Sequence, residues 1–197
     1  MLRRTTSIPA DTSTQHVRAN SEEVALIRRI ATGDARAFEK LYRDYFPRLT
    51  RFLYRMMRRP ALVEEMVNDT MLVVSQKAAA FDSSARVSTW IFSIAYRKGL
   101  KALRDLDEPV EAGPELGCDS GPREELMRQQ LRKVLFEAVH ALSVDHRTVI
   151  ELTYFHGAGY REIAAIMGCP VDTVKTRMFH ARRRLKALLP DQMEDGS

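Results

Sequence analysis

Apolar residues along this chain recur with helical spacing wherever a regular pattern exists. After Asp34, one wide stripe repeats every three or four positions, formed by Phe38, Leu41, Tyr42, Tyr45, Leu49, Phe52 and Leu53. Such spacing is typical of an amphipathic helix with one buried face. No stretch alternates apolar and polar residues as a half-buried strand does. The pattern therefore predicts an all-α protein.

Three more helices are predicted in the first half of the chain. A short one begins at about Ser21, with Asn20 as its N-cap. Pro60 opens another, whose apolar face is formed by Leu62, Met66, Val67, Thr70, Met71 and Val74. A polar stretch, FDSSARVST, precedes the last of them, which extends from Thr89 to about Arg104.

A linker divides the chain, since residues 105–122 contain three prolines and three glycines without helical periodicity. Beyond it, Leu126 to Leu142 is amphipathic, and Ser143 can cap a helix from Val144 to Phe155. The predicted organisation is a disordered leader (1–20), a helical domain (21–104), a flexible acidic linker (105–122), a second helical domain (123–189) and a tail (190–197).

Tyr160 to Leu189 has the pattern of a helix-turn-helix. A short helix ends at Gly168, where positive φ is required, and Pro170 starts a long helix at its first position. The inward seam of that long helix is formed by Val174, Met178, Ala181, Leu185 and Leu188. Its remaining surface presents Lys175, Thr176, Arg177, Phe179, His180, Arg182, Arg183 and Arg184.

A helix with one apolar seam and a basic exterior fits the major groove of duplex DNA. Its first turns would meet base edges and its later arginines would meet phosphates. A basic amphipathic helix standing alone would be interpreted as a solvated surface helix. Here a short helix, a glycine turn and a basic helix occur in order, which favours DNA binding.

The charge distribution supports two nucleic-acid-facing modules. The net charge of +5 divides into +2 for residues 1–20, +7 for 21–104, −6 for 105–122, +5 for 123–189 and −3 for the tail. No apolar run approaches about 18 residues, so no membrane insertion is expected. The N-terminal segment lacks the apolar core of a secretory signal, and two cysteines are too few for a disulfide framework or zinc site. We therefore expect a cytoplasmic protein without a metal or other cofactor.

Several segments together resemble the extracytoplasmic-function (ECF) sigma factors of RNA polymerase. LSVDHRTVIELTYFHGAGYREIAAIMGCPVDTVKTRMFHARRRLKALL resembles their −35-binding region 4. GDARAFEKLYRDYFPRLTRFLYRMM, ALVEEMVNDTMLVVSQK and FDSSARVSTWIFSIAYRKGLKALR are similar, in the family's order, to parts of their region 2. The resemblance implies a non-catalytic subunit that binds core polymerase and directs it to −10 and −35 promoter elements. It also implies contacts with the β′ clamp helices and the β flap, and control by an anti-sigma factor.

The resemblance also implies site residues. An acidic and amide face, otherwise interpreted as solvated surface, would dock on the polymerase through Glu64, Glu65, Asn68 and Asp69. The −10 element would be captured as single strand, with a flipped base, by Ser83, Ser84, Arg86 and Ser88, and its phosphates held by Arg97, Lys98, Lys101 and Arg104. Trp90 could stack on a base, but core packing is the favoured interpretation. The positions that depart from the commonest family pattern leave the promoter sequence open, and they are Asp82, Ala85, Val87 and His180.

Other interpretations stay open at this point. The carboxylates from Asp105 to Asp119 either mimic nucleic acid inside the polymerase or simply solubilise a linker. A stand-alone activator or repressor would usually carry a receiver or ligand-binding domain, and residues 21–104 show neither pattern. A DNA-processing enzyme would need a carboxylate cluster or a catalytic triad, and no such constellation is evident. The sequence assigns no redox role to Cys118 or Cys169.

Overall fold

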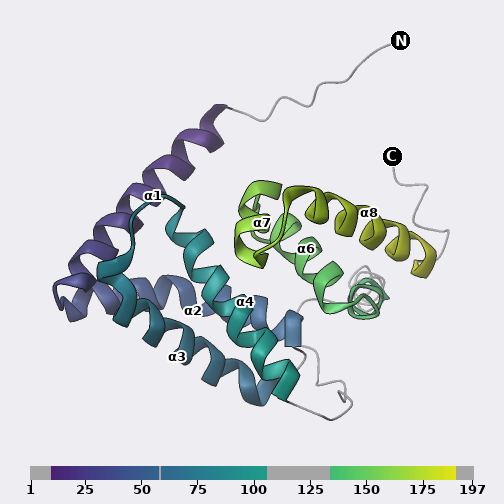
Figure 1. Ribbon diagram of the computed structural model, residues 1–197, viewed down its shortest axis with the longest axis horizontal. Helices are drawn as coiled ribbons and strands as arrows, with labels where there is room; N and C mark the ends of the chain where they lie inside the picture. Colours follow the sequence, from purple (N-terminus) through teal and green to yellow (C-terminus); the bar gives the residue numbers. More distant parts are fainter. Residues whose placement is uncertain (1–9, 58, 106–133, 190–197) are drawn as a thin grey trace, which may run out of the picture.

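The computed structural model describes residues 10–57, 59–105 and 134–189, and every regular element within these ranges is a helix (Figure 1). The first domain holds α1 (Ala10–Ala31), α2 (Ala35–Met57), α3 (Pro60–Lys77), the short 3-10 helix η1 (Ala78–Ala80) and α4 (Val87–Asp105). The second domain holds a helical segment over residues 134–140, followed by α6 (Val144–Tyr154), α7 (Tyr160–Met167) and α8 (Val171–Leu188). The predicted all-α fold with two helical domains is confirmed.

Helix α1 begins much earlier than the sequence pattern predicted. It starts at Ala10 instead of near Ser21, so it includes half of the segment predicted to be a disordered leader. Residues 10–20 contain no glycine or proline, and each residue added to a helix already anchored by buried side chains gains a backbone hydrogen bond. Asn20 therefore lies inside α1 and is not its N-cap. Its Oδ1 instead accepts a hydrogen bond from the backbone N–H of Val87 at 3.1 Å, at the start of α4.

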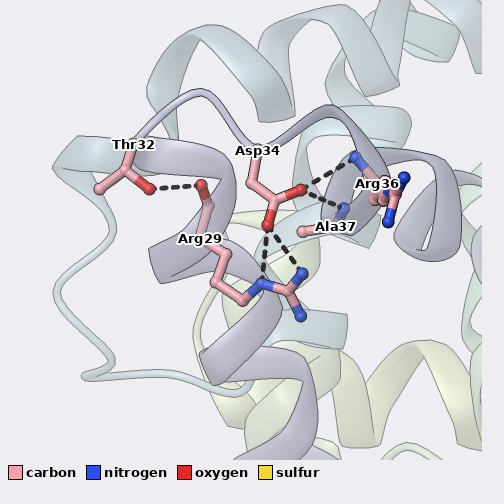
Figure 2. Close-up of polar contacts among 5 residues, drawn as sticks. All are labelled: Arg29, Thr32, Asp34, Arg36 and Ala37. Atoms are coloured by element: carbon pink, nitrogen blue, oxygen red, sulfur yellow. Dashed lines mark hydrogen bonds and ion pairs between the residues drawn. The ribbon is translucent and has the colours of Figure 1, made fainter.

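The turn between α1 and α2 is built around the carboxylate of Asp34 (Figure 2). Its Oδ2 accepts hydrogen bonds from Nε and Nη2 of Arg29 at 2.9 and 2.7 Å, while Oδ1 accepts from the backbone N–H groups of Arg36 and Ala37 at 3.0 and 3.1 Å. The hydroxyl of Thr32 donates to the carbonyl of Arg29. Because the first N–H groups of a helix lack intrahelical acceptors, Asp34 acts as the N-cap of α2. The hydrogen bond from Ala37, followed by those from Arg29, lowers the pKa of the Asp34 carboxyl.

Helix α2 is the centre of the first domain and contacts α1, α3 and α4. Most of its predicted apolar stripe is fully buried, namely Leu41, Tyr45, Leu49, Phe52 and Leu53. Helices α2 and α4 approach each other closely at Gly99. A Cβ placed there would lie 2.9 Å from Cε of Met56 and 3.2 Å from Cδ2 of Leu53.

The second domain follows the predicted capping and turn signals. Ser143 is the N-cap of α6, and Gly168 ends α7 with a φ of 65°, in the left-handed region. Helix α8 starts at Val171, one residue later than predicted, with Pro170 as its N-cap. Its inward seam is confirmed, because Val174, Met178 and Ala181 are buried and Leu185 packs at the edge of the core.

The two domains lie against each other, with α7 next to α4 and α6 next to α2 (Figure 1). None of the helices in the described ranges has the length and hydropathy that a bilayer span requires. Several predictions lie outside the described residues: the acidic linker beyond Asp105, Cys118, the start of the helix predicted from Leu126, and the tail.

Candidate nucleic-acid interface

Helix α8 presents a polar and basic surface opposite its buried seam. The side of the helix predicted to face DNA is solvent-exposed at Lys175, Thr176, Phe179, His180, Arg182, Arg183 and Arg184. Phe179 is unusual among these residues, since it is a large apolar side chain that is 62% exposed. An exposed aromatic beside a row of cations can contact a base or sugar while the cations approach phosphates. The structure therefore brings the predicted −35 residues together on one accessible helix face, with Arg177 at its margin.

Lys175 and Arg177 on α8 are held by carboxylates in this structure. Nζ of Lys175 lies 2.9 Å from Oδ1 of Asp172, and this hydrogen bond lowers the pKa of the Asp172 carboxyl. Arg177 is half-buried and forms an ion pair with Asp145 at the start of α6. Its Nη1 also lies 3.6 Å from Sγ of Cys169. Both cations are therefore partly neutralised by carboxylates of their own domain.

The loop between η1 and α4 borders an open pocket of about 270 Å³. Its walls include the aromatic rings of Phe81 and Trp90, whose centroids are 4.9 Å apart. The loop conformation is fixed by Asp82, whose Oδ1 accepts a hydrogen bond from the backbone N–H of Ser84 at 2.9 Å. Ser83 between them takes a φ of 61°, which is uncommon for a residue other than glycine. A pocket with two rings and a polar rim suits an unstacked base.

The residues predicted to bind the −10 element lie at different places around this pocket. Ser84 lines it, whereas Arg86 and Ser88 line a neighbouring cavity of about 160 Å³ and Ser83 is exposed on the loop. The sequence prediction missed the other lining residues, Ala80, Phe81, Thr89, Ser93 and Ala165. Asp82 and Ala85, two positions that depart from the commonest family pattern, also line the pocket.

Trp90 packs against the core, as predicted from the sequence, and it also borders the pocket. It is half-buried, so one part of the indole contacts the domain while another faces the cavity. The phenylalanine that opens the FDSSARVST stretch is a signal that could have indicated this arrangement, since single-stranded bases commonly stack on aromatic side chains.

The cations on α4 lie in two environments. Arg97, Lys101 and Arg104 are exposed, as a role in holding phosphates requires. Lys98 is half-buried, and its Nζ is 2.6 Å from Oδ2 of Asp69 on α3. The structure thus pairs a residue predicted to hold DNA with one predicted to bind the polymerase.

The predicted polymerase-binding face of α3 is exposed at Glu64, Glu65 and Asn68. Oδ1 of Asn68 accepts a hydrogen bond from the hydroxyl of Tyr42 at 2.7 Å, which fixes the amide. Leu72, one helical turn further along α3, is 54% exposed and was not among the predicted residues. An exposed leucine can form the apolar centre of a protein-binding face, with the neighbouring carboxylates at its polar rim.

A carboxylate of the second domain reaches the loop between η1 and α4. Nη1 of Arg86 lies 3.1 Å from Oε1 of Glu162 on α7. Oε2 of the same glutamate accepts a hydrogen bond from the backbone N–H of Gly159 and so also caps α7. Within the part of the chain that the structure describes, no three His, Cys, Asp or Glu side chains converge as metal ligands would.

Comparisons with known proteins agree with this geometry. Residues 41–108 match the family described as Sigma-70 region 2, and residues 132–185 match Sigma-70, region 4. The chain is 35% identical over 169 residues to the ECF RNA polymerase sigma factor RpoE of Cereibacter sphaeroides, spanning 83% of this chain and 92% of that relative. It is 28% identical over 175 residues to the ECF RNA polymerase sigma-E factor of Haemophilus influenzae, spanning 82% and 92%.

A solved structure shows the same fold. The sigma factor RpoE of Bartonella quintana, determined in complex with the anti-sigma factor NepR, aligns with a TM-score of 0.65 at 25% identity. The alignment covers 80% of this chain and 98% of that one. Together with the two matched regions and their order, these similarities establish that the chain belongs to the ECF RNA polymerase sigma factors, the non-catalytic subunits that direct the polymerase to promoters.

Proposed function

We propose that this sigma factor binds the −35 element with α8 and captures the −10 element at the loop before α4. The division into a −10 domain over residues 21–104 and a −35 domain over 123–189 is part of the proposal. The exposed face of α8 is the observation that carries it. Lys175, Thr176 and Arg177 lie in the first turns, where a recognition helix meets base edges. Arg182, Arg183 and Arg184 follow, where phosphates are expected.

At the −10 element, the pocket lined by the contacting rings of Phe81 and Trp90 would hold an unstacked base against one of them. Ser83, Ser84, Arg86 and Ser88 would contact the surrounding strand. The exposed cations Arg97, Lys101 and Arg104 would hold its phosphates, and Lys98 would join them on leaving Asp69. Because Asp82 and Ala85 line the pocket, they would set which base fits.

Polymerase binding would use the exposed α3 face, comprising Glu64, Glu65, Asn68, Asp69 and Leu72, against the β′ clamp helices. The second domain would contact the β flap. An anti-sigma factor would control the protein in the cytoplasm, which is supported by the similarity to a sigma factor solved with its anti-sigma factor.

The two DNA roles can be separated in holoenzyme made with core polymerase. Trp90→Ala should weaken binding to the −10 single strand by about 1–3 kcal/mol, the usual value of one stacked base, and leave duplex binding unchanged. Arg184→Ala should weaken binding to −35 duplex and reduce the slope of log K against log salt concentration by about 0.9, as expected for one lost phosphate contact.

Arg28→Ala, an exposed arginine on α1, is the control for general loss of positive charge. If Trp90→Ala and Arg184→Ala weakened both DNA probes to the same extent, the assignment of the two elements to two sites would be wrong.

A further inference from the structure

Helix α4 begins without a capping side chain of its own. The carbonyl oxygen of Arg86 accepts the backbone N–H of Trp90 at 3.0 Å, so Arg86 is the residue from which the helix starts and Val87 is its first residue. The first N–H groups of a helix have no intrahelical acceptor, and an arginine side chain carries only donors. The first turn of α4 therefore needs an acceptor from another part of the chain.

Asn20 on α1 supplies this acceptor. Its Oδ1 accepts the backbone N–H of Val87 at 3.1 Å. Asparagine is among the residues preferred for capping a helix that follows it in sequence, and here its amide acts on a neighbouring helix. The side chain of Val87 is fully buried. The start of α4 is thus fixed twice, by a side chain in the core and by a backbone N–H bound to α1.

The position of α1 is itself set by its contacts with the rest of the first domain. Ile27 and Ile30 are buried in the core. Oε1 of Glu23 accepts a hydrogen bond from the hydroxyl of Tyr45 on α2 at 2.8 Å. Because Asn20 lies only three residues before Glu23 on the same helix, these contacts hold its amide in place against α4.

The two rings that border the pocket are attached to elements that α1 contacts. Phe81 directly follows η1, and α1 packs against η1 (Figure 1). Trp90 lies in the first turn of α4, three residues after Val87. A shift of this turn relative to α1 would change the spacing and direction of the two rings. Helix α1 is therefore a common support for both sides of the pocket.

Local contacts shape the tip of the loop over residues 81–86, called the −10 loop below, but they do not fix its ends. Asp82 accepts the backbone N–H of Ser84 from only two residues away, so this turn can move as a unit. Ser83, with a φ of 61°, takes a conformation that persists only where the surrounding structure imposes it. The hydrogen bond from Val87 to Asn20 joins one end of the loop to another helix.

From these contacts we infer that Asn20 is a positioning residue for the −10 site, which holds the start of α4 and thereby the pocket in the form that receives the unstacked base. It would act through Val87 and not by touching DNA. The inference rests on the proposed role of the −10 loop. It gives α1 a part in promoter selection, whereas the sequence analysis gave Asn20 a role only in starting its own helix.

Three variants separate this role from general stability. Asn20→Ala removes the acceptor without weakening α1, because alanine has a higher helix propensity than asparagine. Asn20→Asp is the conservative variant, since it keeps an Oδ acceptor and its charge is favourable near the N-terminus of α4. Asp34→Ala is the matched control, because Asp34 caps α2 in the same domain and does not line the pocket.

The assay measures base preference in holoenzyme made with core polymerase. The probe is a single-stranded oligonucleotide selected from a random pool by the native holoenzyme, together with versions that differ from it by one base. The position at which Trp90→Ala most reduces preference is taken as the base in the pocket. Asn20→Ala should lower preference at that position by about threefold or more, since losing a cap reduces the population of the binding-competent pocket.

A strand whose base does not enter the pocket does not depend on that conformation, so its affinity should be unchanged in Asn20→Ala. Asn20→Asp should return the preference toward the native value, and Asp34→Ala should leave it at that value. Hydrogen exchange of the full chain supplies a second measurement. In Asn20→Ala, exchange should be faster over residues 81–90 and unchanged over α2.

An unchanged base preference in Asn20→Ala would overturn the inference. So would an equal loss in Asn20→Asp or in Asp34→Ala, or faster exchange throughout the first domain, because each would mark an effect other than the loss of this acceptor. Failure of the proposed function gives a different result. Trp90→Ala would then reduce preference at no position, whereas it would still do so if only the role of Asn20 were wrong.

Discussion

Asp145 restrains Arg177, and removing its charge should strengthen −35 binding. The two side chains form an ion pair. The side chain of Arg177 is 25% exposed and that of Asp145 is 38% exposed. Arg177 must leave Asp145 to reach a base or phosphate. The cost of breaking this ion pair therefore offsets part of the free energy that Arg177 gains by binding DNA. Asp145→Asn retains the shape of the side chain and an acceptor for the Tyr96 hydroxyl, but it removes the negative charge.

The size of the effect follows from the exposure of the pair. Ion pairs near the surface contribute about 0.2–1 kcal/mol, since water and salt screen them. Releasing Arg177 should therefore raise affinity for −35 duplex by about 1.4- to 5-fold. In the same way, Arg177→Ala should cost more affinity in the Asp145→Asn background than in the native chain, because Arg177 is then fully available to DNA.

Fluorescence anisotropy with a labelled −35 duplex, selected for binding from a random pool, measures this change. Glu137→Gln makes the same charge change at an exposed position of the second domain, and Tyr96→Phe breaks the interdomain hydrogen bond without touching the ion pair. Both should leave duplex affinity unchanged. The reasoning would be refuted if Asp145→Asn bound no more tightly than the native chain, or if Tyr96→Phe gave the same gain.

Three other predictions concern stability and polymerase binding. Gly99→Ala should alter the free energy of unfolding by less than about 1 kcal/mol, because the gain in helix propensity offsets the displacement of the flexible end of Met56, whereas Gly99→Leu should cost about 1–3 kcal/mol in a urea titration. Asp34→Ala should lower the melting temperature at neutral pH and lower it less in acid. The lowered pKa of Asp34 means that its electrostatic contribution is present above the ordinary value of 3.8 and lost as pH falls through the lower folded value, so melting scans from pH 7 to 3 should show the difference narrow. Glu65→Lys should reduce retention of the chain on immobilised core polymerase at least tenfold while Glu22→Lys on α1 does not, and equal retention of the two would contradict the docking proposal.

Elements defined by local rules were predictable from the sequence. Pro60 opens α3, Ser143 caps α6, Gly168 ends α7 with positive φ, and the seam beginning at Val174 faces the core. Each depends on residues within a few positions, where capping, glycine conformation and side-chain periodicity act. The exposed face of α8 could be identified for the same reason.

Contacts between distant segments could not be predicted. The sequence predicts Asn20 as the N-cap of the helix that begins at about Ser21. In the structure its side chain instead accepts a hydrogen bond from the first residue of α4, 67 positions further along the chain. Arg147 and Glu151 are four residues apart on α6, a spacing that equally fits a solvated surface. Only the folded chain shows that both side chains are buried against α2. Periodicity indicates which face of a helix is buried, but not which partner covers it.

Transcription from purified components tests the central claim most directly. Core polymerase lacking any other sigma subunit, mixed with this protein and fragmented genomic DNA of the source organism, should produce transcripts with discrete 5′ ends preceded by shared −10 and −35 sequences. Transcripts that appear only after a housekeeping sigma factor is added would contradict the assignment and indicate an activator instead.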